Sequence, residues 1–200
     1  EYYFKAKKLR ARHYELPGHP ESPRVFISEL ILDQFSVKLQ NTIREQLDAV
    51  SPDLLVSPDL IFQGSIFPSI SHEAYMQLRE ESEYAAWMYA FGYRANHFTV
   101  SINYLKKFKG ISEVNSFLKD HGFQLNSSGG EIKGTPEQLL EQSSTLADQV
   151  EVKFSDGTHI IPGCYYEFAR RYYDASGNLF SAFIAGSADK IFESTNYRSS

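Results

Sequence analysis

The sequence predicts an α+β fold in which a curved, half-barrel sheet closes over a cavity. Residues 97–122 have the pattern of a strand followed by a helix. Residues 149–171 have the pattern of two strands around an Asp-Gly turn. Strand-like sequence within residues 1–35 could repeat the same unit in degenerate form. We therefore expect βαβββ-like modules with helices inserted between them.

In the first half, residues 1–16 are predicted to be extended and to end at a Pro-Gly turn. The strongly apolar segment 24–32 follows as a strand. Apolar residues recur at helical spacing within residues 36–50, which predicts a helix there. A second, longer helix is predicted over residues 71–91, with Gly92 as its stop.

In the second half, Ser112 is predicted to cap a short helix that Gly122 ends. Thr135 precedes a proline at the first helical position, so a further turn or two of helix begins there. The predicted strands of this half are residues 96–102, 149–154 and 159–171.

Composition excludes several classes of protein. The 200-residue chain is 42% hydrophobic, enough for a sizeable core, and carries a formal net charge of −5 without a long basic run. This charge argues against nucleic acid or an anionic membrane as the main partner and favours a small molecule. The single cysteine, Cys164, excludes an intrachain disulfide and favours a reducing, cytoplasmic compartment. No apolar run approaches the ~18 residues of a spanning helix.

The candidate metal ligands are His97 and Glu167. Strand periodicity places His97, Thr99 and Ser101 on one face of their strand and apolar side chains on the other. Glu167 lies in a second strand, among aromatic and small residues. A His and a Glu that face inward from two strands of one sheet make two-thirds of a 2-His-1-carboxylate metal site.

Both residues also have a purely structural interpretation. A histidine on a strand is more often a structural residue than a ligand, although the polar face around His97 weighs towards a ligand. Glu167 could be an edge-strand carboxylate that faces water. The residues alone leave the role of Glu167 open.

Glu29 shares a strand face with Val25, Ile27 and Ile31, which predicts its burial. A buried carboxylate without a partner costs several kcal/mol or stays protonated, so Glu29 would need a partner. If buried, it could hydrogen-bond a ligand or water on the metal, which makes it a candidate catalytic residue. The alternative is that the opposite face of this strand is buried and Glu29 is solvated.

Four segments of the chain resemble the 2-oxoadipate dioxygenase/decarboxylase (hydroxyglutarate synthase) family in its short bacterial form. They are Arg24–Gln34, Glu83–Ser101, Glu113–Leu146 and Ala188–Thr195. The resemblance implies a vicinal-oxygen-chelate-like fold and a non-haem Fe(II) enzyme that uses O2 to convert 2-oxoadipate into 2-hydroxyglutarate and CO2. It places the second metal histidine of the family on His97 and the metal carboxylate on Glu167.

The resemblance also shapes the expected domain and site. The family's first metal histidine lies in an early His-x-x-x-Arg motif, which this chain lacks, so we expect that motif upstream of Glu1. The whole chain, 1–200, is then one domain: residues 1–35 are the remainder of a first module, 36–92 a helical insertion and 93–200 a second module.

A dicarboxylic substrate would need cationic or hydroxyl partners. Lys7 and Arg10, within a basic strand, could hold its far carboxylate, although a basic strand face is more often solvated. Ser144, with its neighbours Gln142 and Ser143, could line the pocket. Ser187 could do the same or, with greater weight, cap a helix.

Two other functions remain open on the same residues. The first is a glyoxalase-like isomerase or a hydrolase in which Zn or another divalent ion acts as a Lewis acid without O2. The purified protein could also carry another divalent metal, such as Zn or Ni, in place of Fe(II). The second is a binding module that keeps the cavity and has lost the metal.

The expected ligand types agree with the Fe(II) enzyme. Imidazole and carboxylate ligands suit Fe(II), and three protein ligands leave open positions where a 2-oxo acid and O2 can bind.

Overall fold

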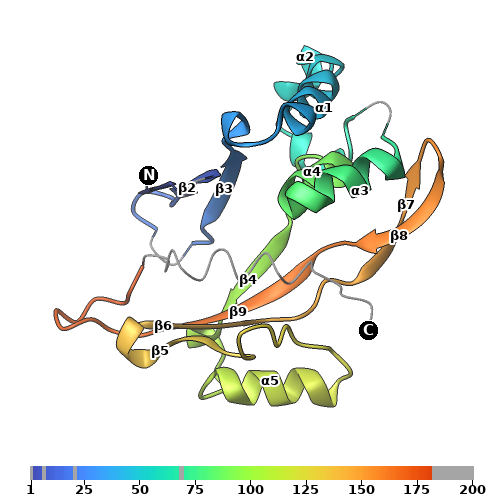
Figure 1. The fold of residues 1–200 in the computed structure, drawn as a ribbon. Helices are drawn as coiled ribbons and strands as arrows, with labels where there is room; N and C mark the ends of the chain where they lie inside the picture. The colour runs from blue at the N-terminus through green and yellow to red at the C-terminus, as the bar shows by residue number, and fades with distance from the viewer. Residues whose placement is uncertain (1, 6–7, 20–21, 68–69, 182–200) are drawn as a thin grey trace.

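The fold was obtained as a computed structural model, which describes residues 2–5, 8–19, 22–67 and 70–181 (Figure 1). Two sheets and one separate hairpin contain all the strands of these residues. The first sheet is antiparallel with the order β1-β2-β3, and the second has the order β4-β9-β6-β5. The strands are β1 (Tyr2–Lys5), β2 (Leu9–Tyr14), β3 (Val25–Leu30), β4 (His97–Ser101), β5 (Lys133–Thr135), β6 (Leu140–Ser144), β7 (Gln149–Phe154), β8 (Gly157–Pro162) and β9 (Tyr165–Arg171).

The second sheet is the predicted βαβββ module. In chain order it consists of β4, helix α5 (Ile111–Asp120), β5, β6 and β9, and β9 pairs parallel to β4. Three details differ from the prediction. The strand predicted over residues 149–154 is β7, which lies outside this sheet and pairs with β8 in the separate hairpin. The β5 and β6 strands were not predicted, and the strand expected over residues 159–171 is divided into β8 and β9. The division falls at Gly163, where an added Cβ would lie 3.2 Å from both methyl groups of Val150.

Four α-helices fill the stretch between the two sheets, within residues 36–92. They are α1 (Val37–Asp48), α2 (Pro52–Leu55), α3 (His72–Glu81) and α4 (Glu83–Phe91). The 3-10 turns are η1 (Leu32–Gln34), η2 (Leu60–Phe62), η3 (Ile102–Tyr104) and η4 (Pro136–Gln138). Among the described helices, none combines the length and apolarity needed to cross a membrane. The division into 1–35, 36–92 and 93–200 stays a prediction.

The helix predicted over residues 71–91 is broken in the middle. Ser82 has an extended backbone with φ −154°, and its hydroxyl accepts a hydrogen bond from the amide of Ala85, which starts α4 as a separate helix. Gly92 ends α4 as predicted, with φ +70° in the left-handed region. The cap predicted for α5 at Ser112 is wrong, because the helix begins two residues earlier, after Gly110.

Two hydrophobic clusters hold these elements together. The larger one contains most of α4, including Trp87 and Phe91, and packs against α3 and the β7–β8 hairpin. The indole N–H of Trp87 donates a 3.0 Å hydrogen bond to the carbonyl of Gly163, at the bend between β8 and β9. The smaller cluster lies under α5 and is built from Ile102, Ile111, Val114 and Leu118.

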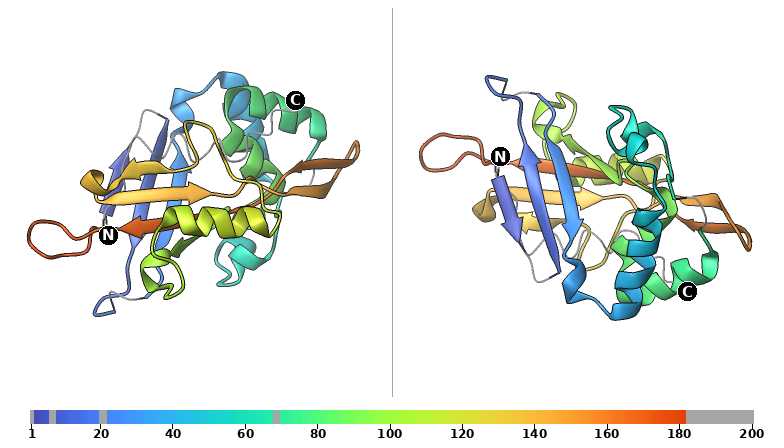
Figure 2. Two further views of the ribbon diagram at one scale, coloured as in Figure 1. Left: turned by 90° about the horizontal axis from the view of Figure 1, so that it is seen from below. Right: turned by 90° about the horizontal axis from the view of Figure 1, so that it is seen from above.

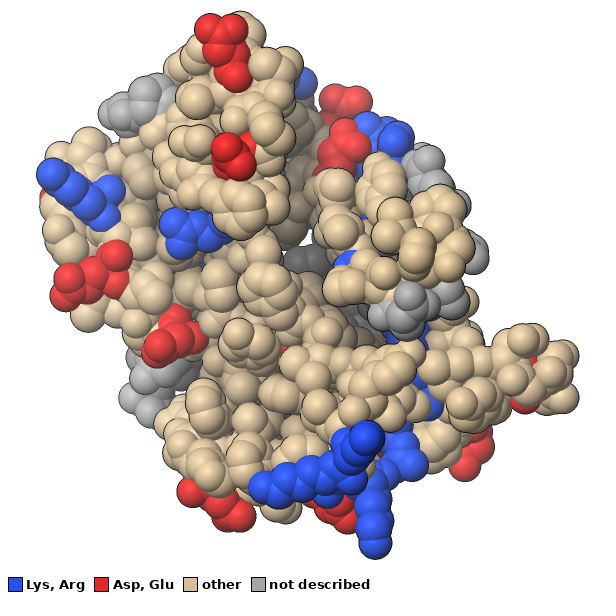
Figure 3. Space-filling view, turned by 180° about the vertical axis from the view of Figure 1, so that it is seen from behind, with Lys and Arg blue, Asp and Glu red and all other residues tan. Residues whose placement is uncertain are grey.

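The two sheets lie one over the other, which determines where a site can form. Figures 1 and 2 show α5 across one face of the β4-β9-β6-β5 sheet and the β1-β2-β3 sheet crossing over the opposite face. The space-filling view from behind shows a hollow that is bordered by the helices, the first sheet and the second sheet (Figure 3). We call the face of the second sheet that looks towards β1-β2-β3 the inner face.

Candidate metal centre

Strand register brings His97 and Glu167 onto the same inner face. Their strands β4 and β9 are adjacent, with His97 opposite Tyr165 and Thr99 opposite Glu167. Ser144 of β6 lies opposite Glu167 on the other side. Because paired residues point to the same face and faces alternate along a strand, all five side chains share one face, and His97 and Glu167 are diagonal neighbours.

The other face of this sheet is packed against α5. The hydroxyl of Ser143 donates a 2.7 Å hydrogen bond to the side-chain oxygen of Asn115 in α5, and Phe168 packs against the cluster beneath that helix. The segment Gln142–Ser144 therefore alternates, so that only Gln142 and Ser144 lie on the inner face. The inner face is therefore the face of this sheet that α5 does not cover.

The carboxylate of Glu167 is buried and asymmetrically hydrogen-bonded. The side chain is only 2% exposed. The amide of Gln142 donates a 2.8 Å hydrogen bond to Oε1, and the hydroxyl of Thr99 donates a 3.1 Å bond to the same atom. Among the described residues, no donor contacts Oε2. Burial raises the pKa of Glu167, against the opposing effects of the two hydrogen bonds and of the charges on Arg171 and Lys133.

The surroundings of the His97 imidazole favour the tautomer and the uncharged state that a metal ligand needs. Its Nδ1 lies 3.3 Å from the side-chain oxygen of Asn96. A tautomer that donates from Nδ1 leaves the lone pair of Nε2 free. Burial lowers the pKa of His97 to about 4, so the ring is uncharged at neutral pH. The ring stacks on Tyr165 with centroids 5.0 Å apart, which fixes its orientation.

Tyr165 brings a buried hydroxyl without a partner to the same place. The residue is 3% exposed, and its hydroxyl has no hydrogen-bond partner in the described part of the chain. Burial raises the pKa of Tyr165 well above its ordinary value, so the group stays a donor. Buried polar groups are normally hydrogen-bonded, so this hydroxyl is a candidate partner for a bound molecule.

These residues fit a divalent metal ion. A neutral imidazole nitrogen and a carboxylate oxygen without a donor are the ligand types that first-row divalent ions take in oxygenase sites. Within residues 2–5, 8–19, 22–67 and 70–181 there is no group of three or more His, Cys, Asp or Glu side chains that could hold a metal. His97 and Glu167 thus form a pair to which a further ligand must be added.

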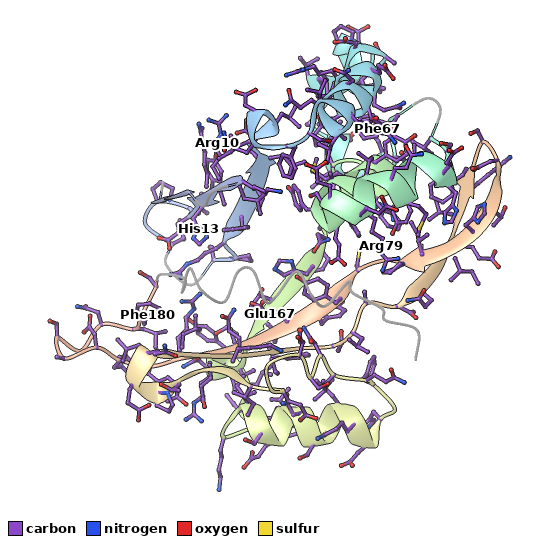
Figure 4. All side chains as sticks on the ribbon, viewed as in Figure 1. Arg10, His13, Phe67, Arg79, Glu167 and Phe180 are labelled. Carbon is purple, nitrogen blue, oxygen red and sulfur yellow. The ribbon has the colours of Figure 1, made fainter. Side chains whose placement is uncertain are left out.

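Three cationic or titratable groups of this region had not been predicted as site residues. His13, on β2, is 8% exposed and points from the first sheet towards the sheet of Glu167 (Figure 4). Arg171 follows Glu167 by four residues, so it lies on the inner face, and it donates a 3.1 Å hydrogen bond to the carbonyl of Phe180. Lys133, in register with Gln142, is buried at 7% exposure. Strand alternation from Glu167 could have indicated Arg171.

The chain is similar to known proteins over most of its length. A model of the 2-oxoadipate dioxygenase/decarboxylase family matches residues 61–180. A chloroplastic 2-oxoadipate dioxygenase/decarboxylase of Arabidopsis thaliana is 40% identical over 96% of this chain. The chain belongs to the 2-oxoadipate dioxygenase/decarboxylase family. It spans 58% of the length of that Arabidopsis relative.

Solved structures show the same fold. A structure from Shewanella frigidimarina has 52% identity and a TM-score of 0.86, with 92% of this chain and 72% of that chain covered. The hydroxyglutarate synthase of Oryza sativa, in complex with 2-oxoadipate, has 34% identity and a TM-score of 0.85, covering 98% of this chain and 70% of its own. A glyoxalase-superfamily structure from Ralstonia eutropha has 19% identity and a TM-score of 0.73, covering 93% and 64%. The fold is therefore α+β and vicinal-oxygen-chelate-like.

Two residues expected at the site of this family member lie elsewhere. The predicted burial of Glu29 is wrong: its side chain is 53% exposed and forms a two-pronged ion pair with Arg10. Both residues are on the outer face of the first sheet, which Figure 4 shows for Arg10, on the side away from Glu167. Strand alternation allowed either face of β3 to be the buried one. The structure shows that the face with Ser28 and Leu30 is more buried than the face with Glu29.

The other residues that were expected at the site have different locations. Ser144 lies on the inner face beside Glu167 and is 3% exposed. Lys7 and Ser187 lie outside the described residues. Phe98 and Tyr166, the aromatic neighbours of His97 and Glu167 in the sequence, lie on the opposite face and are 61% and 53% exposed.

Proposed function

We propose that this chain carries the metal centre of a non-haem Fe(II) enzyme that converts 2-oxoadipate, with O2, into 2-hydroxyglutarate and CO2. The observation that carries the proposal is that His97 and Glu167 are neighbours on the inner face and that no donor in the described part of the chain contacts Oε2 of Glu167. Membership of the 2-oxoadipate dioxygenase/decarboxylase family supports the choice of reaction. The single cysteine supports a reducing, cytoplasmic setting.

The roles of the ligands follow from their protonation states. Nε2 of neutral His97 and Oε2 of Glu167 would hold the metal, which supplies Lewis-acid and O2-binding chemistry when bound. The Asn96 side chain keeps the His97 ring in one tautomer, and Tyr165 keeps its plane fixed. A third protein ligand would come from outside the described residues.

The substrate is anionic, and the inner face carries positive charge to receive it. The charges of Arg171 and Lys133 reach Glu167 and counteract the rise in its pKa. A 2-oxo dicarboxylate would be attracted by the same charges. The hydroxyl of Tyr165 and the side chain of Ser144 are placed to donate hydrogen bonds to a molecule bound beside the metal. The 2-oxoadipate held by the rice relative supports this substrate class.

The experiment measures O2 uptake and CO2 release by the full-length protein loaded with Fe(II). We expect both with 2-oxoadipate, and a much lower rate with 2-oxohexanoate, which has the same chain length and only one carboxylate. A His97→Ala variant should lose the reaction, and His121→Ala, which changes the exposed histidine that follows the last residue of α5, should retain it.

Each other outcome has a defined meaning. Equal turnover of 2-oxohexanoate would contradict the dicarboxylate substrate. Metal binding without any O2 uptake, with isomerase or hydrolase activity under Zn or Ni, would favour a glyoxalase-like or hydrolytic enzyme. A full-length protein that binds the oxo acid but no metal would favour a non-catalytic binding module.

A further inference from the structure

We propose that Gln142 and Thr99 are positioning residues that force Glu167 to bind the metal through Oε2 alone. The inference rests on the proposed metal centre and adds to it how the carboxylate is held. It concerns two neutral side chains, one from each strand that flanks β9. Neither residue is itself a metal ligand.

The geometry places one donor on each side of the carboxylate. Gln142 reaches across from β6, where it lies one inner-face position away from Ser144, the register partner of Glu167. Thr99 reaches across from β4, directly opposite Glu167. Their distances to Oε1 are 2.8 and 3.1 Å, so both contacts are hydrogen bonds of ordinary length.

Gln142 is itself held in place. It is 3% exposed and lies in the middle of the sheet, with Lys133 of β5 and Ala169 of β9 as its register partners. An amide confined in this way has few other orientations. The hydrogen bond to Glu167 is therefore set by the sheet itself and does not depend on a mobile loop.

Both donors occupy the same oxygen, and that decides the mode of metal binding. Each carboxylate oxygen has two lone-pair sites. Gln142 and Thr99 together fill both sites of Oε1, so this atom has none left for a metal ion. Oε2, which no described donor contacts, keeps its two. Glu167 is thus a one-oxygen ligand, and a coordination position that a two-oxygen carboxylate would fill stays open for the substrate.

A purely structural role makes a different prediction. If the two donors only compensate for the burial of a charged group, their loss lowers the stability of the fold and leaves the metal geometry unchanged. If they position Glu167, their loss changes the coordination of the metal. The visible absorption spectrum of bound Co(II) reports coordination number and geometry, and so separates the two roles.

The test titrates full-length protein with Co(II) and compares four changes with the wild type. Gln142→Met removes one donor at similar size, and we expect a ~10- to 100-fold loss of Co(II) affinity, the usual effect of losing a ligand's hydrogen-bond partner, with an altered spectrum. Thr99→Val should act in the same direction and more weakly, whereas Thr99→Ser keeps the donor and should restore the wild-type spectrum. Ser143→Ala is the matched control, because it removes a buried hydrogen bond from the same strand on the α5 face, and it should leave the spectrum unchanged.

Failure of the inference and failure of the metal centre are distinguishable. Glu167→Ala is the reference for the metal centre itself. If Glu167→Ala binds Co(II) like the wild type, the metal centre is wrong. If Glu167→Ala loses Co(II) but Gln142→Met and Thr99→Val keep the wild-type affinity and spectrum, the positioning role alone is overturned. Should Gln142→Met not fold, the isosteric Thr99→Val and its Thr99→Ser counterpart decide the question.

Discussion

Glu29 and Glu167 are two strand carboxylates with opposite surroundings. Glu29, on the outer face of the first sheet, is 53% exposed and pairs with the guanidinium of Arg10. Glu167, on the inner face of the second sheet, is 2% exposed and receives two neutral donors, both on one oxygen. Both oxygens of the exposed carboxylate are paired, while one oxygen of the buried carboxylate has no donor among the residues that the structure describes.

The difference supports Glu167, and not Glu29, as the carboxylate of the proposed metal centre. A buried charge is costly unless it is paired or coordinates a metal, so a fold has little reason to retain one that is only half satisfied. The inner face also holds the hydroxyl of Tyr165, for which the described residues supply no hydrogen-bond partner. Among the described residues, Glu29 on the outer face is therefore paired, while Oε2 of Glu167 and the hydroxyl of Tyr165 on the inner face have no donor or partner. Changes to each face should have different consequences.

The largest effect is expected from Glu167→Gln in the full-length protein. It should abolish iron binding, a greater loss than the ~10- to 100-fold typical of changes to a ligand's neighbours. The metal-free variant should be more stable than the metal-free wild type, because burial raises the pKa of Glu167 and the amide carries no charge to desolvate. For a chain of this size each kcal/mol raises Tm by about 2–4 °C.

The stability difference has a defined pH dependence. In the folded protein, burial raises the pKa of Glu167 above its ordinary value of 4.5. The wild type therefore loses stability as pH rises from 4.5 through the raised pKa, and the variant does not. Metal analysis and thermal unfolding across this range test both claims. A Glu167→Gln variant that binds iron, or that is less stable than the wild type at neutral pH, would contradict the difference drawn between Glu29 and Glu167.

An intermediate effect is expected from Tyr165→Phe. Removal of a buried hydroxyl without a partner should leave the stability unchanged or slightly higher. If that hydroxyl donates to bound substrate, KM for 2-oxoadipate should rise about tenfold, the equivalent of about 1.4 kcal/mol. Tyr166→Phe is the matched control, since its ring lies on the opposite face and is 53% exposed. A KM that is the same in both variants would remove Tyr165 from the site.

The smallest effect is expected from Glu29→Gln. Iron content and turnover should not change, and the variant should lose about 0–1 kcal/mol of stability at neutral pH, as is usual for an exposed ion pair. The hydrogen bond from Arg10 lowers the pKa of Glu29, so this contribution is present above 4.5 and disappears as pH falls through the lowered pKa. Urea unfolding at neutral and acidic pH measures it. Loss of iron in this variant would place Glu29 at the metal after all.

The sequence was sufficient to predict helices and strands whose pattern lies within one short segment. Helical spacing within residues 36–50 corresponds to α1, and strand alternation placed His97 and Thr99 on one polar face. Alternation alone does not say which face is buried. For the strand of Glu29 the aliphatic face turned out to be exposed, with Val25 and Ile27 more than half exposed beside the ion pair.

Other features depend on contacts between distant segments. The hydrogen bond between Gln142 and Glu167 joins positions 25 residues apart and exists only because β6 pairs with β9. The short β5 and β6 strands lack a strong apolar alternation of their own. Ser82 breaks a continuous helical pattern through its own capping hydrogen bond, a local signal that could have been recognised. The four-residue spacing between Glu167 and Arg171 could likewise have indicated that Arg171 lies on the inner face.

The most direct measurement is the position of the metal in crystals of the full-length protein, from anomalous scattering at the iron edge. We predict one peak on the inner face, roughly 2.0–2.2 Å from Nε2 of His97 and from a single oxygen of Glu167, Oε2. The Oε1 atom should stay beyond bonding distance, in contact with Gln142 and Thr99. A peak elsewhere, or none in protein that turns over 2-oxoadipate, would contradict the account.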